Sequence, residues 1–269
     1  MQKIYLMKNT PVLILVLVAF LLLGFNKKGK EKYIENLGFV YIPSGTMQYK
    51  GDEVSVNGFY IFETEITNKQ YQEFLFNLKK QKNWEALKVC SVDSANWNVA
   101  LSFDNSYAKE YHLTSQFAEY PVVNISYEAA ILFCNWLQLK INEKVDGAIV
   151  RLPSKSEWVY AAKGGSADAK YPWDNQQLKN KKDIEFCNYN SPDDGTCLAT
   201  NFSRSYYPNS YGLYNMSGNV SEWTNIPGET IGGSWDSDAL HMRLEADDLH
   251  SGSNNPSAYI GLRPVVIVN

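Results

Sequence analysis

The pattern of hydrophobic and polar residues changes along the chain and predicts where strands, helices and loops lie. Residues 38–43 and 54–62 are rich in β-branched and aromatic side chains, a composition that favours strands. Pro43, Ser44 and Gly45 end the first of these runs, while Gly58 indicates a turn or bulge within the second. The folded part of the chain is therefore expected to begin with strands.

Three later segments repeat apolar residues with the period of an amphipathic helix. The first follows Thr67 and the third follows Ser154, each with the spacing of a capping box, and the second follows Ser126. The third is expected to stop at Gly164 and Gly165. The apolar faces predicted for these helices are Tyr71, Phe74, Leu75 and Leu78; Ala130, Phe133, Cys134, Leu137 and Ile141; and Trp158, Ala161 and Ala162.

The remaining segments lack a helical period. Residues 83–120 look irregular apart from a short helix expected around 84–89, and residues 166–269 are divided by Gly and Pro into short strands and long loops. Helices followed by a loop-rich half predict an α+β fold with low regular secondary-structure content.

The first 26 residues differ from all of these. Lys3 and Lys8 precede an apolar run of about 14 residues, and Lys27, Lys28 and Lys30 follow it, which is typical of a secretory signal and short for a membrane span. We therefore divide the chain into a signal peptide or N-terminal membrane anchor (1–26), a linker (27–36) and one domain (37–269). The sequence leaves open whether the first segment is cleaved. We expect the domain to be exported and to lie in the bacterial cell envelope, either in the periplasm or anchored to the membrane. It is expected to contact the membrane only through the N-terminal segment.

Composition excludes several classes of protein. An aromatic content of 14% argues against a disordered chain, and a net charge of −4 without a basic stripe argues against nucleic-acid binding. The three histidines show no zinc-ligand spacing. Four cysteines leave three disulfide pairings open, and one of them includes a local bridge between Cys187 and Cys197 within a polar loop. These cysteines are Cys90, Cys134, Cys187 and Cys197.

A series of motifs carries more information than the composition. In chain order the motifs occupy residues 39–46, 62–71, 120–126, 133–136, 150–162, 171–173, 211–223, 232–235 and 261–263. Together they closely resemble the formylglycine-generating enzyme family, also called sulfatase-modifying factors, over about residues 37–269. The resemblance implies a formylglycine-generating-enzyme-like fold, a decorated form of the C-type lectin fold. Within the series, we interpret Trp158, Trp223 and Trp235 as core residues.

The segment 215–222 offers oxygen ligands of the kind that calcium prefers. Asn215 and Glu222 can supply side-chain oxygens, and Gly218 and Val220 can supply main-chain oxygens. The resemblance implies that these positions bind calcium; the alternative is that Asn215 caps a turn and Glu222 pairs with a surface cation. The resemblance also implies a second calcium site, for which the candidates are Asn188, Tyr189, Asp194 and Thr196, with Asp193 as a substitute for Asp194.

The chain departs from the family near its C-terminus. The resemblance implies a pair of thiols that bind copper(I) and drive the oxidation of a substrate cysteine to formylglycine. Ser237 and Met242 occupy the matching positions, and neither can form a thiolate. We therefore predict no catalytic residues, a degenerate site at Ser237 and Met242, and no copper cofactor.

These observations predict a catalytically silent envelope protein that acts as a structural or protein-binding module and whose partners are other envelope proteins. Segments 120–126 and 133–136 look like those of gliding-motility and type IX secretion proteins with this fold, although no lipobox cysteine follows the apolar run. Two alternatives stay open: an oxidase acting on cysteine through a non-standard site, and a C-type-lectin-like variable protein that binds ligands through residues between 232 and 263.

The N-terminal segment is testable by itself. Residues 1–40, fused to a reporter that matures only after export, should yield an active reporter because a basic segment precedes the apolar run. An inactive reporter that accumulates in the cytoplasm would contradict the prediction.

Overall fold

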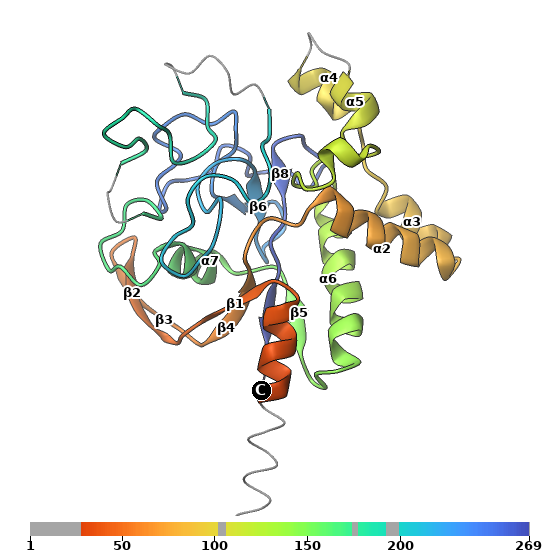
Figure 1. Ribbon diagram of the computed structural model, residues 1–269, viewed down its shortest axis with the longest axis horizontal. Helices are drawn as coiled ribbons and strands as arrows, with labels where there is room; N and C mark the ends of the chain where they lie inside the picture. The colour runs from red at the N-terminus through yellow and green to blue at the C-terminus, as the bar shows by residue number, and fades with distance from the viewer. Residues whose placement is uncertain (1–27, 102–105, 174–176, 192–198, 269) are drawn as a thin grey trace, which may run out of the picture. The chain divides into compact units, whose positions relative to one another are not determined.

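The computed structural model describes residues 28–101, 106–173, 177–191 and 199–268 (Figure 1). The chain divides into two units, residues 1–38 and 39–269. In the first unit, residues 28–36 are helical, where the sequence analysis expected a linker. Across the described ranges no helix has both the length and the apolarity needed to cross a membrane. The export segment predicted at 1–26 lies outside these ranges.

Strands from both ends of the second unit meet in one antiparallel sheet. Its order is β1-β4-β9-β5, with Tyr60 opposite Val266 where the early strand β4 pairs with the last strand β9. All four residues of β4 are buried. The bounds are β1 Phe39–Ile42, β4 Phe59–Phe62, β5 Ile149–Arg151 and β9 Val265–Ile267.

Two smaller sheets complete the strand content of the described residues. The hairpin β2 (Gly45–Tyr49) and β3 (Asp52–Val56) turns at Lys50 and Gly51, both of which have positive φ. The other sheet has the order β7-β6-β8, and its β6–β8 pair is parallel. Its bounds are β6 Ser221–Trp223, β7 Thr230–Ile231 and β8 Ile260–Gly261.

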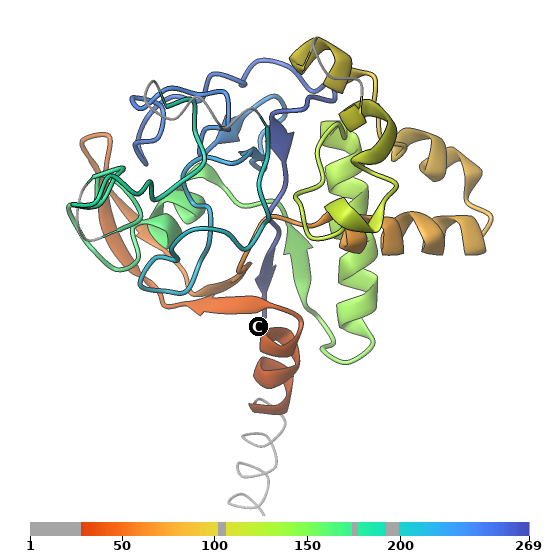
Figure 2. The same ribbon diagram turned by 45° about the horizontal axis from the view of Figure 1, so that its top comes forward.

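The three predicted helices form as expected. Thr67 caps α2 (Asn68–Lys80) and Ser154 caps α7 (Lys155–Ala162), each in a complete capping box, and Ser126 caps α6 (Tyr127–Asn142). Trp158 on α7 is fully buried. In Figures 1 and 2, helices α2, α3 (Trp84–Val89) and α6 lie on the opposite side of β9 from the β2–β3 hairpin, and α7 lies close to that hairpin.

The segment 83–120 contains more structure than its pattern predicts. Beyond α3, which was predicted, it holds two five-residue helices, α4 (Asn96–Ala100) and α5 (Ser106–Glu110), and the short 3₁₀ helix η1 (Ser115–Phe117). Trp97 anchors this segment: it is fully buried, and its ring centroid lies 4.7 Å from that of Tyr111. Such short helices depend on tertiary packing because one turn alone is unstable.

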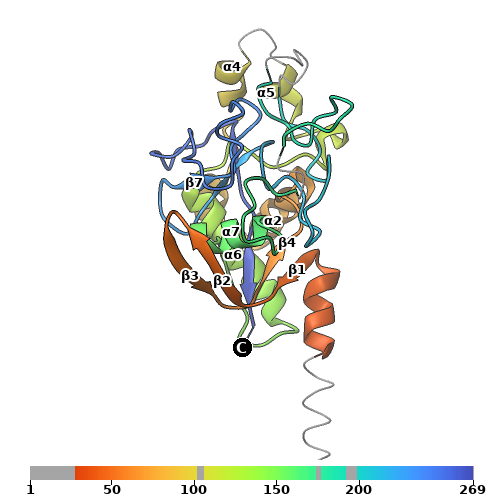
Figure 3. The ribbon, with the colours of Figure 1, turned by 90° about the vertical axis from the view of Figure 1, so that its left-hand side faces the viewer.

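Figure 3 shows the loops of the C-terminal half, in teal and blue, gathered above the strands β1 to β4. Trp223 and Trp235 are buried among these elements, which confirms their prediction as core residues. Cys90 and Cys134 are free and buried, and burial raises the pKa of each thiol to about 12. Neither is therefore a reactive thiolate near neutral pH. Cys197 lies outside the described residues, so a bridge to Cys187 stays one of the open pairings.

Candidate functional site

Ser237, which the resemblance assigned to the family's first thiol position, lies in the loop that follows β7, and its side chain is fully buried. The Oγ atom of Ser237 accepts a hydrogen bond from the backbone N–H of Ser234 at 3.0 Å. The carbonyl oxygen of Ser237 accepts another from the N–H of Asn190 at 2.9 Å. The hydroxyl is thus used to fix the loop.

Met242, which the resemblance assigned to the second thiol position, is also fully buried and belongs to a cluster with Tyr171, Trp173, Cys187 and Tyr189. It packs against Gly233, where an added Cβ would overlap the Met242 Cε atom. Gly233 also has a φ of 69°, a conformation that glycine adopts without strain. The space beside Gly233 is therefore filled by a packed thioether.

A serine–histidine contact lies beside Ser237 and was missed by the sequence analysis. Ser234 Oγ lies 2.8 Å from His250 Nε2, and burial lowers the pKa of His250. Near neutral pH we therefore assign Ser234 as the donor and the neutral imidazole as the acceptor. The His250 ring stacks on Tyr259 with centroids 4.7 Å apart. Ser234 is fully buried, so this contact joins two loops rather than presenting a nucleophile to solvent.

Asp248 holds the same loops from the other side. Its two carboxylate oxygens accept hydrogen bonds from the hydroxyls of Ser221 and Thr230 and from the backbone N–H groups of Gly233 and His250, at 2.9 to 3.1 Å. One carboxylate thus connects β6, β7 and two positions in the segment 232–259 that follows β7. No short sequence motif indicates this role of Asp248, because its four hydrogen-bond donors come from separate positions in the chain.

The predicted calcium ligand Glu222 lies on β6 with no exposed surface, between Arg263 and Trp158. The Arg263 Nε and Nη2 atoms donate to Glu222 Oε1 at 2.9 and 2.8 Å. The indole N–H of Trp158 donates to Glu222 Oε2 at 2.6 Å. Both carboxylate oxygens therefore have partners, and the charge of Glu222 is matched by a buried guanidinium.

The second predicted ligand, Asn215, faces a different carboxylate. Its Nδ2 donates to Glu65 Oε2 and to the carbonyl oxygen of Ser203, both at 3.1 Å. Asn219 Nδ2 donates to Glu65 Oε1 at 2.9 Å. The Oδ1 atom of Asn215 is buried and has no hydrogen-bond partner among the described residues.

Glu65 was not identified from the sequence, yet it is fully buried at the centre of this cluster. Desolvation raises its pKa to about 8, against the lowering effect of nearby Arg263. Because the folded state holds this proton more tightly than the unfolded state, Glu65 makes stability decrease as the pH rises from about 4.5 to about 8. Hydrogen bonds from the amides of Asn215 and Asn219 and the positive charge of Arg263 reduce this loss of stability.

The second predicted calcium site is described only in part, because Asp193, Asp194 and Thr196 lie outside the described residues. Asn188 Nδ2 donates to Asn219 Oδ1 at 3.1 Å, and the Asn188 carbonyl accepts from the Asn219 N–H at 2.7 Å. That carbonyl occupies the place where a Cβ on Gly218 would lie. Tyr189 is buried in the cluster around Met242. The structure thus joins residues from the two predicted sites through Asn219.

The fit of these residues to calcium is partial. Asn215 Oδ1, a buried acceptor without a partner, suits a cation. Glu222 does not suit a cation, because calcium would share both of its carboxylate oxygens with the guanidinium of Arg263, which is also positively charged. The main-chain groups of Gly218 and Val220 lie in a loop whose N–H groups at Gly218 and Asn219 bond to Gly232 and Asn188. The contacts of Glu222 therefore favour the ion-pair alternative, with a buried rather than a surface cation.

Comparison with known proteins identifies relatives along nearly the whole chain. The profile of the "Sulfatase-modifying factor enzyme 1-like domain" matches residues 25–267. The "Formylglycine-generating enzyme" of Mus musculus is 26% identical over 204 residues, which is 64% of this chain and 50% of that protein. The "Inactive C-alpha-formylglycine-generating enzyme 2" of Mus musculus is 28% identical over 193 residues, 64% of this chain and 59% of that protein. The chain thus spans about half the length of these relatives.

Solved structures share the fold. "Treponema denticola variable protein 1" superposes with a TM-score of 0.56 at 20% identity, covering 84% of this chain and 94% of that one. At this identity the likeness concerns the fold alone. It confirms the α+β, formylglycine-generating-enzyme-like architecture expected from the motifs.

The geometry of Glu222 predicts how its variants behave. Glu222→Gln leaves the buried Arg263 without a counter-charge and should lower the free energy of unfolding by about 3–5 kcal/mol. Asn215→Ala leaves Glu65 short of one donor and should cost about 1–3 kcal/mol. Both losses are measured by urea denaturation. The loss for Glu222→Gln should be the same in calcium and in chelator, because the partner of Glu222 is Arg263 rather than an ion.

The control is Glu119→Gln, which removes an exposed partner of Lys69 and should cost no more than about 1 kcal/mol. A loss for Glu222→Gln that is present with calcium and absent with chelator would assign Glu222 to calcium instead.

Proposed function

Since the chain belongs to the sulfatase-modifying factor family, we propose that it is a non-catalytic member that acts as a structural or protein-binding module of the bacterial cell envelope. The proposal rests on the burial and the contacts of Ser237 and Met242, the residues assigned to the two thiol positions. Ser237 is committed to a loop hydrogen bond and Met242 is packed against Gly233, and both are fully buried. Neither residue offers copper(I) a thiolate.

Two further observations support a loss of catalysis. Burial keeps the thiols of Cys90 and Cys134 protonated, so they do not replace the missing pair. The family also includes relatives named as inactive, such as the mouse protein described above. A fold that persists after its chemistry is lost is available for binding, because the packed loops keep a defined surface.

The cellular setting rests on the sequence. The basic and apolar N-terminal segment supports export, and the segments 120–126 and 133–136 support a relation to gliding motility or type IX secretion. The partners proposed on this basis are other envelope proteins. Cross-linking in intact cells followed by purification of the full chain tests this setting. Recovery of cytoplasmic proteins alone would contradict it.

A second candidate is a ligand-binding variable protein, favoured by the fold shared with the Treponema denticola structure. The loops between β7 and β8 would carry the variation, since Leu240 and Leu249 there are exposed. A reverse-transcriptase gene next to a near-copy of the coding sequence for residues 232–263 would favour this candidate over a fixed structural module.

Calcium stays a proposal, supported by the unpartnered Asn215 Oδ1 and opposed by the Arg263–Glu222 pair. The comparison of calcium with chelator described for Glu222→Gln tests it directly. A parent protein that calcium stabilises, with Asn215→Ala abolishing that stabilisation, would support the site. An unchanged unfolding midpoint after verified removal of calcium would refute it.

Copper(I) titration tests the loss of catalysis. The reduced full chain should show no tight, stoichiometric copper(I) binding, because a serine hydroxyl and a buried thioether replace two thiolates. The double variant Ser237→Cys/Met242→Cys serves as the positive control and should gain binding. Tight binding by the parent that disappears in Met242→Leu or His241→Ala would contradict the proposal and reopen the oxidase alternative.

A further inference from the structure

Helices α2 and α3 form a hairpin whose closed end projects away from the sheets (Figures 1 and 2). Between residues 76 and 89 this hairpin carries four lysines and a single acidic residue, although the chain as a whole has a net charge of −4. All five of these side chains are exposed. They are Lys79, Lys80, Lys82, Lys88 and Glu85.

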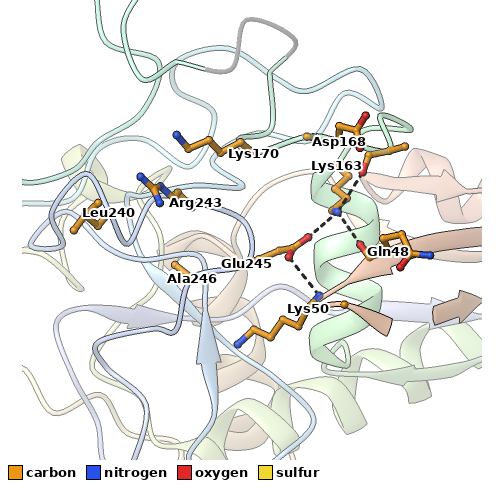
Figure 4. Close-up of a pocket in the computed structure, with 12 residues that line it drawn as sticks. Gln48, Lys50, Lys163, Asp168, Lys170, Leu240, Arg243, Glu245 and Ala246 are labelled. Atoms are coloured by element: carbon orange, nitrogen blue, oxygen red, sulfur yellow. Dashed lines mark hydrogen bonds and ion pairs between the residues drawn. The ribbon is translucent and has the colours of Figure 1, made fainter. Parts of the chain in front are cut away.

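The four lysines of the hairpin have no ion pair and no side-chain hydrogen bond among the residues that the structure describes. The lysines beside the cavity in Figure 4 differ, because they hold the fold together. There Lys163 Nζ donates to the carbonyl oxygen of Gln48 and to Glu245 Oε1, at 3.0 and 2.8 Å, and Lys50 pairs with Asp247 at 2.7 Å. The charges of the hairpin are therefore available to an anionic partner.

The turn between the two helices places a lysine where helices usually have glycine. The N–H of Asn83 donates to the carbonyl oxygen of Leu78 at 3.0 Å, and the N–H of Lys82 donates to that of Lys79 at 3.1 Å, which together form a Schellman motif. Lys82 has a φ of 58°, a conformation that glycine adopts without the strain of a side chain. Ending the helix thus does not explain a lysine at this position, whereas contact of its charge with an anionic surface does.

Two large apolar side chains are exposed beside these lysines. Phe76 is 65% exposed and lies on the side of α2 opposite its buried residues, one turn before Lys79 and Lys80. Trp84 begins α3, is 57% exposed, and lies one turn before Lys88. Neither ring makes an aromatic contact with the described residues. Lysines around exposed aromatic side chains are typical of protein surfaces that rest in the headgroup region of an anionic bilayer.

The position of these residues favours a bilayer over an acidic protein as the partner. They lie on a projecting end, which a folded acidic protein could cover only with a concave surface. A bilayer needs no such match, because an aromatic ring can enter the headgroup layer while lysine side chains extend to the lipid phosphates.

We propose that the end of the α2–α3 hairpin docks on the surface of a bilayer that contains anionic phospholipids. The four lysines contact lipid phosphates, and Phe76 and Trp84 enter the headgroup region. This inference goes beyond the proposed function and does not depend on it. The hairpin adds a second membrane contact to the N-terminal segment, which was expected to be the only one.

A fluorescent label on the hairpin tests the proposal in the full chain. The exposed position in Gln81→Cys takes a water-sensitive label such as nitrobenzoxadiazole, whereas burial keeps the thiols of Cys90 and Cys134 unreactive. The parent, treated in the same way, gives the background. Vesicles of phosphatidylglycerol and phosphatidylcholine should brighten the label, less so as salt rises, and pure phosphatidylcholine vesicles should not. Because the label reports on the hairpin itself, the result does not depend on whether the N-terminal segment enters the bilayer.

Charge variants of the labelled chain separate docking from stability. Lys79→Gln and Lys80→Gln should each raise the lipid concentration at half-maximal response about fivefold. Lys82→Gly should do the same without lowering the thermal unfolding midpoint, since glycine suits the turn. Glu85→Gln should lower that lipid concentration, because it removes the acidic charge. The matched control is Lys109→Gln, an exposed lysine on α5 outside the hairpin, which should change nothing.

Equal responses to anionic and to pure phosphatidylcholine vesicles would overturn the proposal. So would lysine variants that respond like the parent hairpin, or a label at Lys109→Cys that responds as strongly as the label at Gln81→Cys. A larger response to soluble oligo-glutamate than to anionic vesicles would assign the hairpin to an acidic protein instead. None of these outcomes bears on the copper titration, which concerns the segment of Ser237 and Met242.

Discussion

The buried ion pair between Arg263 and Glu222 is the interaction on which the arrangement of the domain depends. Besides Glu222, the Arg263 guanidinium donates to the carbonyl oxygens of Phe62 and Tyr214, at 3.0 and 2.8 Å. It therefore joins β4 of the four-stranded sheet to β6 of the three-stranded sheet, while Trp158 adds α7 through the same carboxylate. Removing either charge leaves the other buried and unpaired, which is why such a pair fixes one arrangement even where its net stabilisation is small.

That arrangement also explains how the loops of the C-terminal half stay ordered with few backbone ladders. Buried carboxylates at Glu65 and Asp248 gather backbone and side-chain donors from separate loops. Within this frame, Met242 fills the space against Gly233. The same loop presents Arg243 on its outer side. The chain is therefore closed around Met242, and a basic side chain lies exposed directly outside it.

The sequence predicted the parts of the fold that local patterns control. The caps at Thr67, Ser126 and Ser154 follow from spacing alone, and so do the buried faces of α2, α6 and α7, except that Leu75 on α2 is only half-buried. Strand β2 was missed because GTMQY lacks alternation and forms through its pairing with β3. In the site, the motif identified Asn215 and Glu222 but not their partners. Glu65, Asp248 and Arg263 lie far from them in sequence, and only the folded chain brings them within hydrogen-bonding distance.

The central proposal is that the buried Ser237 and Met242 leave this family member without oxidase activity. The most direct measurement incubates the purified full chain with copper, oxygen and a sulfatase-type peptide containing cysteine, and follows the peptide by mass spectrometry. Our account predicts that the cysteine stays unmodified, while an active family enzyme in the same buffer converts it. Formylglycine produced by this chain in a copper-dependent reaction would contradict the account.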